Sequence, residues 1–455
     1  MSLHYVSFFV GAGFPNESLA AAESLPLDFV GADAGTIDVG PYQLAGDGTI
    51  FSETLCKHDI SRALGLARRK RIPLVIGSCG GSGRDWGVDW FADMVRETAR
   101  DQNLGPFKIA RIYAEPDRDL LKHRLSEGRI HALSAHAEPY TSALIDRSTR
   151  IVGVMGVEPF IAALEKGADV VLAGRATDSA IFTAIPLMRG RSPALSWHAA
   201  KVAECGGAIG DPPKNDLLHV ELLDDNFLVR PLAPGAQCTP RSVAAHQLYE
   251  NADPTRFVEP SGTIDAADVK YRAHDAHITR ISGARFEPAA QYTMKLEGVE
   301  PAGYQSVAMA SYSDRVLLDE LPKWLKHTRE EIDAKLARVF GARADEAILT
   351  IRTYGAGDGA DLFASERPSI PQADAFFLLD AVAPTQEMAT AVVNVAWHTL
   401  IHSPPSQWRG GVITAAWPFN PPIIERGRMH RFNVNHIVEL DDPLETLRFE
   451  YEDVR

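Results

Sequence analysis

The chain has 455 residues, of which 45% are hydrophobic and 23% are charged, which is typical of a globular protein with a sizeable core. Its formal net charge of −14 argues against nucleic-acid binding, which usually needs a basic face. The amino terminus lacks the basic and apolar regions of a signal peptide, and no apolar run is long enough to cross a membrane. We therefore expect a cytoplasmic protein with neither a nucleic-acid nor a membrane partner.

Strand and helix patterns alternate over the first 212 residues. Five short apolar runs each end in a cluster of glycine or polar residues, and they cover residues 4–10, 28–31, 73–77, 151–155 and 170–173. Such runs, alternating with helical patterns, predict parallel strands joined by crossover helices. The sequence thus predicts an α/β domain over residues 1–212, with an open doubly wound sheet as the first choice and a barrel-like closure as the second.

The pattern changes after residue 212. Shorter, alternating strand patterns occur at residues 217–223, 227–229, 277–281 and 292–296, with one short helix pattern at 242–251. Longer helix patterns follow at residues 317–340 and 387–402. We predict an α+β region over residues 213–455 that completes the active-site crevice.

The loop at residues 77–85 follows an apolar run and precedes a helix pattern. In parallel sheets, ligands bind outside the carboxyl ends of the strands, where backbone N–H groups at a helix start attract anions. An arginine there can clamp a carboxylate or phosphate with two bonds, whereas the alternative is a tight strand-to-helix turn. The loop matches no nucleotide fingerprint. Its candidate substrate-binding residues are Ser78, Gly80, Gly81, Ser82 and Arg84.

Two further loops carry candidate site residues. Asp33 and Asp38 are carboxylates five residues apart, suited to acid–base catalysis or to a hard cation, and Thr36 between them is a candidate for substrate binding. The alternative is that they make local loop hydrogen bonds. Arg175 ends a buried run, where it can reach a substrate carboxylate, and its candidate partners in substrate binding are Thr177 and Asp178, which otherwise cap the next helix.

Glu204 and Lys295 complete the catalytic candidates. Glu204 ends a helix pattern just before two glycines, and it either faces the crevice or belongs to an ordinary helix end. Lys295 sits inside a strand pattern, where a partly buried lysine has a lowered pKa and can act as a base. On an edge strand Lys295 would face solvent.

No cofactor follows from the sequence. The four cysteines lie far apart, which supports neither a disulfide framework nor a zinc site. His131 and His136 are five residues apart and do not match the spacing of a helical zinc pair. The sequence therefore identifies no cofactor. A divalent metal ion stays an open alternative, although no motif supports it.

Several segments together resemble a known family, the AtuA-like acyclic terpene utilisation family. The segments that carry the resemblance are residues 31–41, 73–83, 155–160, 167–178, 204–206, 241–246, 248–254, 292–298, 383–387 and 438–444. The resemblance implies an enzyme of organic-acid catabolism that acts on a carboxylic acid or an acyl thioester such as an acyl-CoA. It supplies no catalytic residue.

Together these patterns indicate a hydratase, lyase or isomerase with an arginine and glycine-loop anion clamp and a carboxylate or lysine base. Two alternatives stay open, namely a non-catalytic subunit that binds acyl groups or carboxylates within a larger complex, and a metal-dependent hydrolase. The expected partner is a small organic acid or acyl thioester. Assembly into a homo-oligomer is also left open.

The acidic charge balance yields a first prediction. With a net charge of −14, we expect no appreciable affinity for duplex DNA at physiological salt, because phosphate neutralisation dominates such binding. A mobility-shift titration of labelled duplex with the pure protein measures this. A salt-dependent shift would contradict it.

Overall fold

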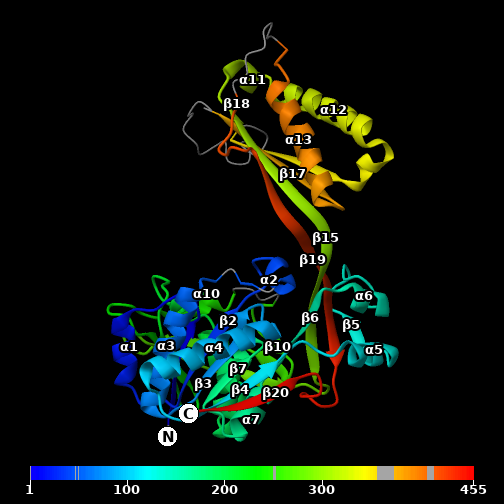
Figure 1. Cartoon of the computed structure of the whole chain (residues 1–455). Coiled ribbons are helices and arrows are strands. Elements are labelled where there is room, and N and C mark those ends of the chain that lie inside the picture. The colour runs from blue at the N-terminus through cyan, green and yellow to red at the C-terminus, as the bar shows by residue number, and fades with distance from the viewer. Residues whose placement is uncertain (1, 47, 50, 249–252, 356–373, 407–414) are drawn as a thin grey trace. The chain divides into compact units, whose positions relative to one another are not determined.

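The structure is a computed structural model that describes residues 2–455 except 47, 50, 249–252, 356–373 and 407–414. The chain divides into two compact units. The first consists of Met1–Glu300 and Phe432–Arg455, and the second of Pro301–Arg431. Figure 1 labels the helices and strands.

A ten-stranded sheet forms the centre of the first unit. Its five middle strands, β1, β2, β3, β7 and β4, are parallel, and the pairs toward both edges are antiparallel. From one edge to the other the order is β12 (Lys270–Ala273), β13 (Thr279–Ser282), β9 (Phe227–Pro231), β8 (Leu218–Leu222), β1 (Leu3–Phe9), β2 (Phe29–Gly35), β3 (Leu74–Gly81), β7 (Val170–Ala173), β4 (Phe107–Tyr113) and β20 (Arg448–Val454).

Helices cover both faces of this sheet. One face packs against α1 (Asn16–Glu23), α3 (Glu53–Lys70) and α4 (Asp85–Gln102), with α3 and α4 side by side in Figure 1. The other face packs against α7 (Glu158–Glu165), α8 (Asp178–Met188) and α9 (Pro193–Ala203). The predicted α/β class, with parallel strands and crossover helices in the amino-terminal half, is confirmed.

Burial explains why the sequence revealed these strands. The parallel strands are covered on both faces, so their residues are apolar throughout instead of alternating with polar ones. All four residues of β7 and the first three of β3 are fully buried. Successive side chains still point to opposite faces, so that Tyr5 of β1 packs with the α8 side and Val6 with the α3 side.

One expected parallel strand lies elsewhere. The run at residues 151–155 forms β6 (Arg150–Val154), which pairs antiparallel with β15 (Thr293–Tyr312), so its predicted place in the parallel sheet was wrong. The fifth parallel strand is instead β4, which the sequence patterns missed. Lys108 and Arg111 interrupt the apolar character of β4, because this strand is only partly covered near the sheet edge.

Smaller elements complete the first unit. A three-stranded antiparallel sheet lies apart from the main one, and β5 pairs with β19. The short helix predicted at residues 242–251 is α10, which ends at His246, while residues 249–252 lie outside the described part. These elements are β10 (Arg256–Glu259), β11 (Gly262–Asp265), β14 (Arg285–Pro288), β5 (Ile130–Ala132), α2 (Tyr42–Ala45), α5 (Arg118–Ser126), α6 (Ser142–Arg147), the 3₁₀ helix η1 (Gly206–Ile209) and α10 (Pro240–His246).

The second unit is an α+β arrangement with a core of its own. Its strands β16 (Ile348–Tyr354), β17 (Ala375–Ala383) and β15 pair antiparallel, and α12 (Leu321–Phe340) and α13 (Gln386–His402) pack together beside β17. The remaining elements are α11 (Arg315–Asp319), the 3₁₀ helix η2 (Gly341–Glu346), β18 (Ala415–Ala416) and β19 (Ile423–Glu439). The long strands β15 and β19 also contribute residues to the first unit.

A glycine contact between β3 and α4 yields a stability prediction. Gly80 has a φ of +75°, and a Cβ there would lie 2.5 Å from the Cα of Gly87. We expect Gly80→Ala to destabilise the first unit by about 3 kcal/mol, because it adds a backbone overlap to the roughly 1–2 kcal/mol cost of a left-handed residue. Urea denaturation measures the loss.

Gly167 provides the matched control. Its φ is +78°, and apart from its chain neighbours no atom of the described residues lies within 4 Å of the position of its Cβ. Gly167→Ala should therefore cost only about 1–2 kcal/mol, the strain term alone. Equal losses for the two variants would show that the contact with Gly87 adds nothing.

Candidate functional site

The neighbouring strands β3 and β7 mark the topological switch point of the sheet, because the helices that follow them lie on opposite faces. The chain leaves β3 toward α4 on one face and leaves β7 toward α8 on the other face. Ligand sites of such sheets lie at these switch points, outside the carboxyl ends of the strands. Here the two loops meet, since the N–H of Arg175 donates to the carbonyl of Gly83 over 2.8 Å.

Arg175 is the cation at the centre of this region. Its side chain is partly buried, its Nε donates to Oε2 of Glu297 over 3.0 Å, and one Nη donates to Oγ of Ser78 over 3.5 Å. Glu297 also accepts from Nζ of Lys295 over 2.7 Å. Although burial alone would raise it, the pKa of Glu297 lies below its usual range because of the charges of Arg175 and Lys295.

Two carboxyl groups adjoin Arg175, that of the buried Asp33 and that of the partly buried Asp178. Burial raises the pKa of Asp33 well above its usual range, and the negative charge of Asp178 adds to this against the charge of Arg175. Burial also raises the pKa of Asp178. Among the described residues, Oδ1 of Asp33 has no hydrogen-bond partner. The pair is therefore disposed to hold a proton at neutral pH.

A second group of acids surrounds Lys201 of α9. Its Nζ donates to Oε1 of Glu204 over 2.7 Å, and the hydroxyl of Ser179 donates to the other oxygen over 3.2 Å. Burial raises the pKa of Glu204 to about 8 and that of Glu259 to about 7. The charge of Asp178 contributes to both shifts, so this group and the aspartate pair form one cluster.

The predicted loop residues near β3 make close internal contacts. Besides the contact between Gly80 and Gly87, a Cβ on Gly81 would overlap the side chain of Gln43, and the hydroxyl of Ser82 donates to the carbonyl of Gln43 over 3.2 Å. These contacts belong to a tightly packed turn, and they account for the glycines independently of any ligand.

Arg84 and Arg175 lie on loops that meet, but their side chains bond to different groups. The buried guanidinium of Arg84 donates to the carbonyl of Gly46 and, over 3.3 Å, to Oε1 of Glu115. The contacts of Arg175, in contrast, lie with Ser78 and Glu297. The structure thus brings Ser78, rather than Arg84, to the guanidinium of Arg175.

The remaining predicted residues occupy two settings. Thr36 and the exposed Asp38 follow β2, where the N–H of Asp38 donates to the hydroxyl of Thr36 over 3.1 Å. Asp38 is close enough to contribute to the raised pKa of Asp178. Thr177 precedes α8 without capping it through its side chain, and its hydroxyl acts instead on the carboxyl of Glu259, whose pKa it lowers.

Sequence reasoning omitted four residues that line the cluster, namely Lys201, His246, Glu259 and Glu297. Lys201 carries no local signal, because it lies on a helix without any motif. A signal did exist for His246 and Glu297, since the segments that resemble the family include residues 241–246 and 292–298.

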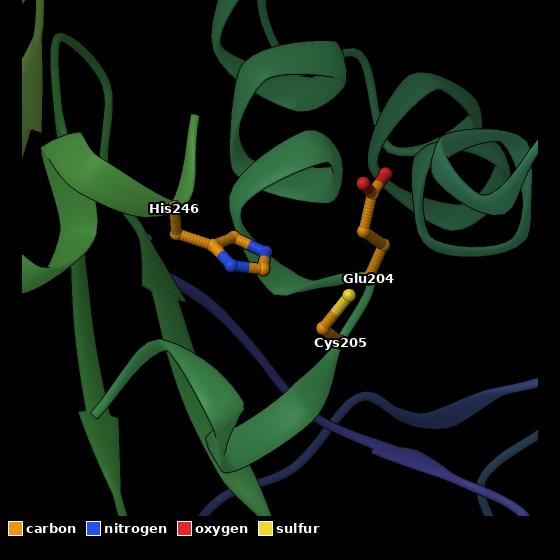
Figure 2. Close-up of side chains that lie close together, drawn as sticks. All are labelled: Glu204, Cys205 and His246. Atoms are coloured by element: carbon orange, nitrogen blue, oxygen red, sulfur yellow. The ribbon is translucent and has the colours of Figure 1, made fainter. Parts of the chain in front are cut away.

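One group of side chains has a donor set that suits a metal ion. The ligand atoms of Glu204, Cys205 and His246 lie within 4.8 Å of one another. Figure 2 shows the imidazole of His246 reaching from α10 toward the thiol of Cys205, with Glu204 beside it. All four cysteines of the chain are free thiols.

The fold and the cluster together define an α/β protein with buried carboxyl groups at the carboxyl ends of its parallel strands. A comparison with family models matches residues 37–209 and 226–419 to the acyclic terpene utilisation family protein AtuA. The chain belongs to this family. Comparisons with curated proteins and with solved structures gave no match. In the described residues, no helix is both long and apolar enough to span a membrane.

The raised pKa of Glu259 predicts a pH dependence of stability. Its pKa is about 7 in the fold against an ordinary value of 4.5, so the folded state keeps a proton that the unfolded chain has lost. Stability should therefore fall as the pH rises from about 4.5 to about 7, and this group should contribute about 3 kcal/mol of that loss.

The variant Glu259→Gln isolates this contribution, because the amide does not titrate. Urea denaturation of the wild type and the variant at several pH values should show a flatter profile for Glu259→Gln. The exposed Glu330 serves as a control, and Glu330→Gln should keep the wild-type profile. An unchanged slope in Glu259→Gln would refute the raised pKa.

Proposed function

We propose that the chain is an enzyme that moves protons on a small organic acid or acyl thioester, as a hydratase, lyase or isomerase does. The observation that supports this most directly is the pair of Asp33 and Asp178 beside Arg175, at the carboxyl ends of β2, β3 and β7, where burial raises the pKa of both acids. Buried acids with raised pKa values beside a fixed cation are typical of catalytic sites. Membership of a family named for terpene utilisation agrees with a catabolic role.

Arg175 is the anion-binding group of this proposal. Its two hydrogen bonds among the described residues use Nε and one Nη, whereas a guanidinium has five N–H donors. The others suit a substrate carboxylate or thioester oxygen, which a planar guanidinium binds better than an ammonium group does. Because Glu297 and Ser78 fix the guanidinium, substrate binding would need little reorganisation.

The aspartate pair supplies base and acid. Two close carboxyl groups share one proton, so one member is ionised while the other is protonated. The ionised member removes a proton from the carbon next to the carbonyl, and the C–H electron pair moves onto the carbonyl oxygen, which Arg175 stabilises. In an elimination the electron pair on the oxygen then returns to form the carbon–carbon double bond and expels a β-substituent, which takes the proton of the protonated aspartate. In an isomerisation the proton that was removed returns to another carbon of the substrate.

The other predicted catalytic residues take supporting places in this scheme. Lys295 is bonded to Glu297 and its side chain is 42% exposed, so it acts as a positioning residue for Glu297. Glu204 and Asp38 act on Asp178 through their charge. We also propose that the protein works in the reducing cytoplasm, since its cysteines are free thiols, and that a second copy of the chain is a candidate partner.

A panel of organic acids and acyl thioesters, assayed for turnover, tests the proposal. Formation of an unsaturated, hydrated or rearranged product supports it. Tight binding without any product would instead identify a non-catalytic binding subunit. Release of free thiol and acid, dependent on an added metal, would identify a metal-dependent hydrolase.

Arg175→Lys gives the sharpest prediction for this site. Lysine keeps the charge and loses the planar fork, so kcat/KM should fall by about tenfold or more, as expected for the loss of a charged hydrogen bond of about 1.5–3 kcal/mol. Activity assays and melting curves on the same variant check this. Full activity in a well-folded variant would remove Arg175 from the substrate site.

Arg111→Lys is the matched control for that variant. Arg111 of β4 is also partly buried and pairs with two carboxylates, Asp89 and Glu450, outside the cluster. Its replacement should lower the melting temperature to a comparable extent while kcat/KM stays near the wild-type value. Equal activity losses in both variants would mean that activity merely follows stability.

A further inference from the structure

Glu204, Cys205 and His246 bring three different donor types together from two separate segments. A carboxylate oxygen, a thiol sulfur and an imidazole nitrogen all lie within 4.8 Å of one another. Glu204 and Cys205 directly follow α9, and His246 is the last residue of α10. We infer that these three side chains form a binding site for one divalent transition-metal ion of the zinc type.

The donor set selects the class of metal. Zinc binds thiolate, imidazole and carboxylate ligands, whereas magnesium and calcium prefer oxygen ligands alone. A site with one sulfur, one nitrogen and one oxygen donor therefore favours zinc and its neighbours over the hard cations. Three protein donors leave one tetrahedral position for water or a substrate oxygen, as in catalytic zinc sites.

The local fold holds the three donors on regular elements. The helix η1 begins directly after Cys205, and α10 packs against η1, which brings His246 to the end of α9. The carboxylate of Glu204 is held by Lys201 and Ser179 at 2.7 and 3.2 Å. Such hydrogen bonds to a ligating carboxylate fix its orientation in metal sites.

The charges around the donor set also favour a bound cation. The carboxyl groups of Asp178, Glu204 and Glu259 each interact electrostatically with one ammonium group, that of Lys201. Glu259 is buried, and burial raises its pKa although the hydroxyls of Thr177 and Ser179 lower it. When these carboxyl groups are ionised they outnumber the ammonium group, and a divalent cation would offset the excess of negative charge.

The three ligand atoms need to move only slightly closer to one another to bind one zinc ion. With bond lengths of about 2.0–2.3 Å, donors of a tetrahedral zinc ion lie roughly 3.5 Å apart. Separations of up to 4.8 Å therefore need a contraction of about 1 Å. Rotation about the side-chain bonds of Cys205 and His246 can supply this, because both residues are only partly buried.

This inference does not depend on the proposed reaction, because Cys205 and His246 have no role in it. Metal binding can be measured without any substrate. The full chain, treated with a chelator and dialysed, is titrated with Zn²⁺ in a calorimeter and with Co²⁺ in a spectrophotometer. We expect one ion per chain and a sulfur-to-cobalt charge-transfer absorption in the near ultraviolet.

Variants assign the site. Cys205→Ser and His246→Ala each remove one donor, and each should weaken Zn²⁺ binding by about 100-fold or more. The matched controls, Cys238→Ala and His277→Ala, remove a cysteine and a histidine outside the donor set and should bind Zn²⁺ as the wild type does. Melting curves in the absence of metal establish that each variant is folded.

Alkylation gives a second measurement that needs no variant. Bound Zn²⁺ should protect Cys205 from iodoacetamide, as read from the mass of its peptide. Absence of stoichiometric binding, absence of the cobalt–sulfur band, unprotected Cys205, or wild-type affinity in Cys205→Ser and His246→Ala would each overturn the inference. Binding that is lost in these two variants and kept in the controls supports it.

Discussion

The ion pair between the partly buried Arg175 and the buried Glu297 is the contact on which the candidate site depends. Burying a guanidinium and a carboxylate is costly unless their geometry is good, and here Nε and Oε2 are 3.0 Å apart. Arg175 follows β7 of the main sheet, whereas Glu297 belongs to β15, which pairs with β6 in another sheet. The pair therefore holds the loop after β7 at a fixed place relative to two sheets, and with it the contact between Arg175 and Ser78.

Stability alone does not account for the acids around this pair. Carboxyl groups with raised pKa values make the folded state less stable at neutral pH than amides of the same shape would, because they must either keep a proton or carry an uncompensated charge. Asp33, Asp178, Glu204 and Glu259 are all of this kind. Because these acids lower the stability of the fold and lie near the carboxyl ends of β2, β3 and β7, their charges and protons are better explained by ligand binding or catalysis than by stability.

The sequence predicts features that depend on neighbouring residues, and it does not predict contacts between distant segments. The runs of β3 and β7 are buried on both faces and read directly as parallel strands, and Asp33, Ser78 and Arg175 come just after strands or within their last residues. The run of β6 looks the same in sequence, but its partner β15 lies more than a hundred residues away, so its antiparallel pairing had no local signal. For the same reason the contact of Glu297 with Arg175, 122 residues away in the chain, could not be predicted.

The first turn of α8 connects the two halves of the cluster. Asp178 adjoins Arg175, and the next residue, Ser179, donates its hydroxyl to Glu204. The ammonium of Lys201 lowers the pKa of both Asp178 and Glu204 against the effect of burial. A cation bound at Glu204 would repel that ammonium, and any movement of Lys201 would change the proton affinity of Asp178. A cation bound at Glu204 would therefore be coupled electrostatically to the protonation of the aspartate pair through the first turn of α8.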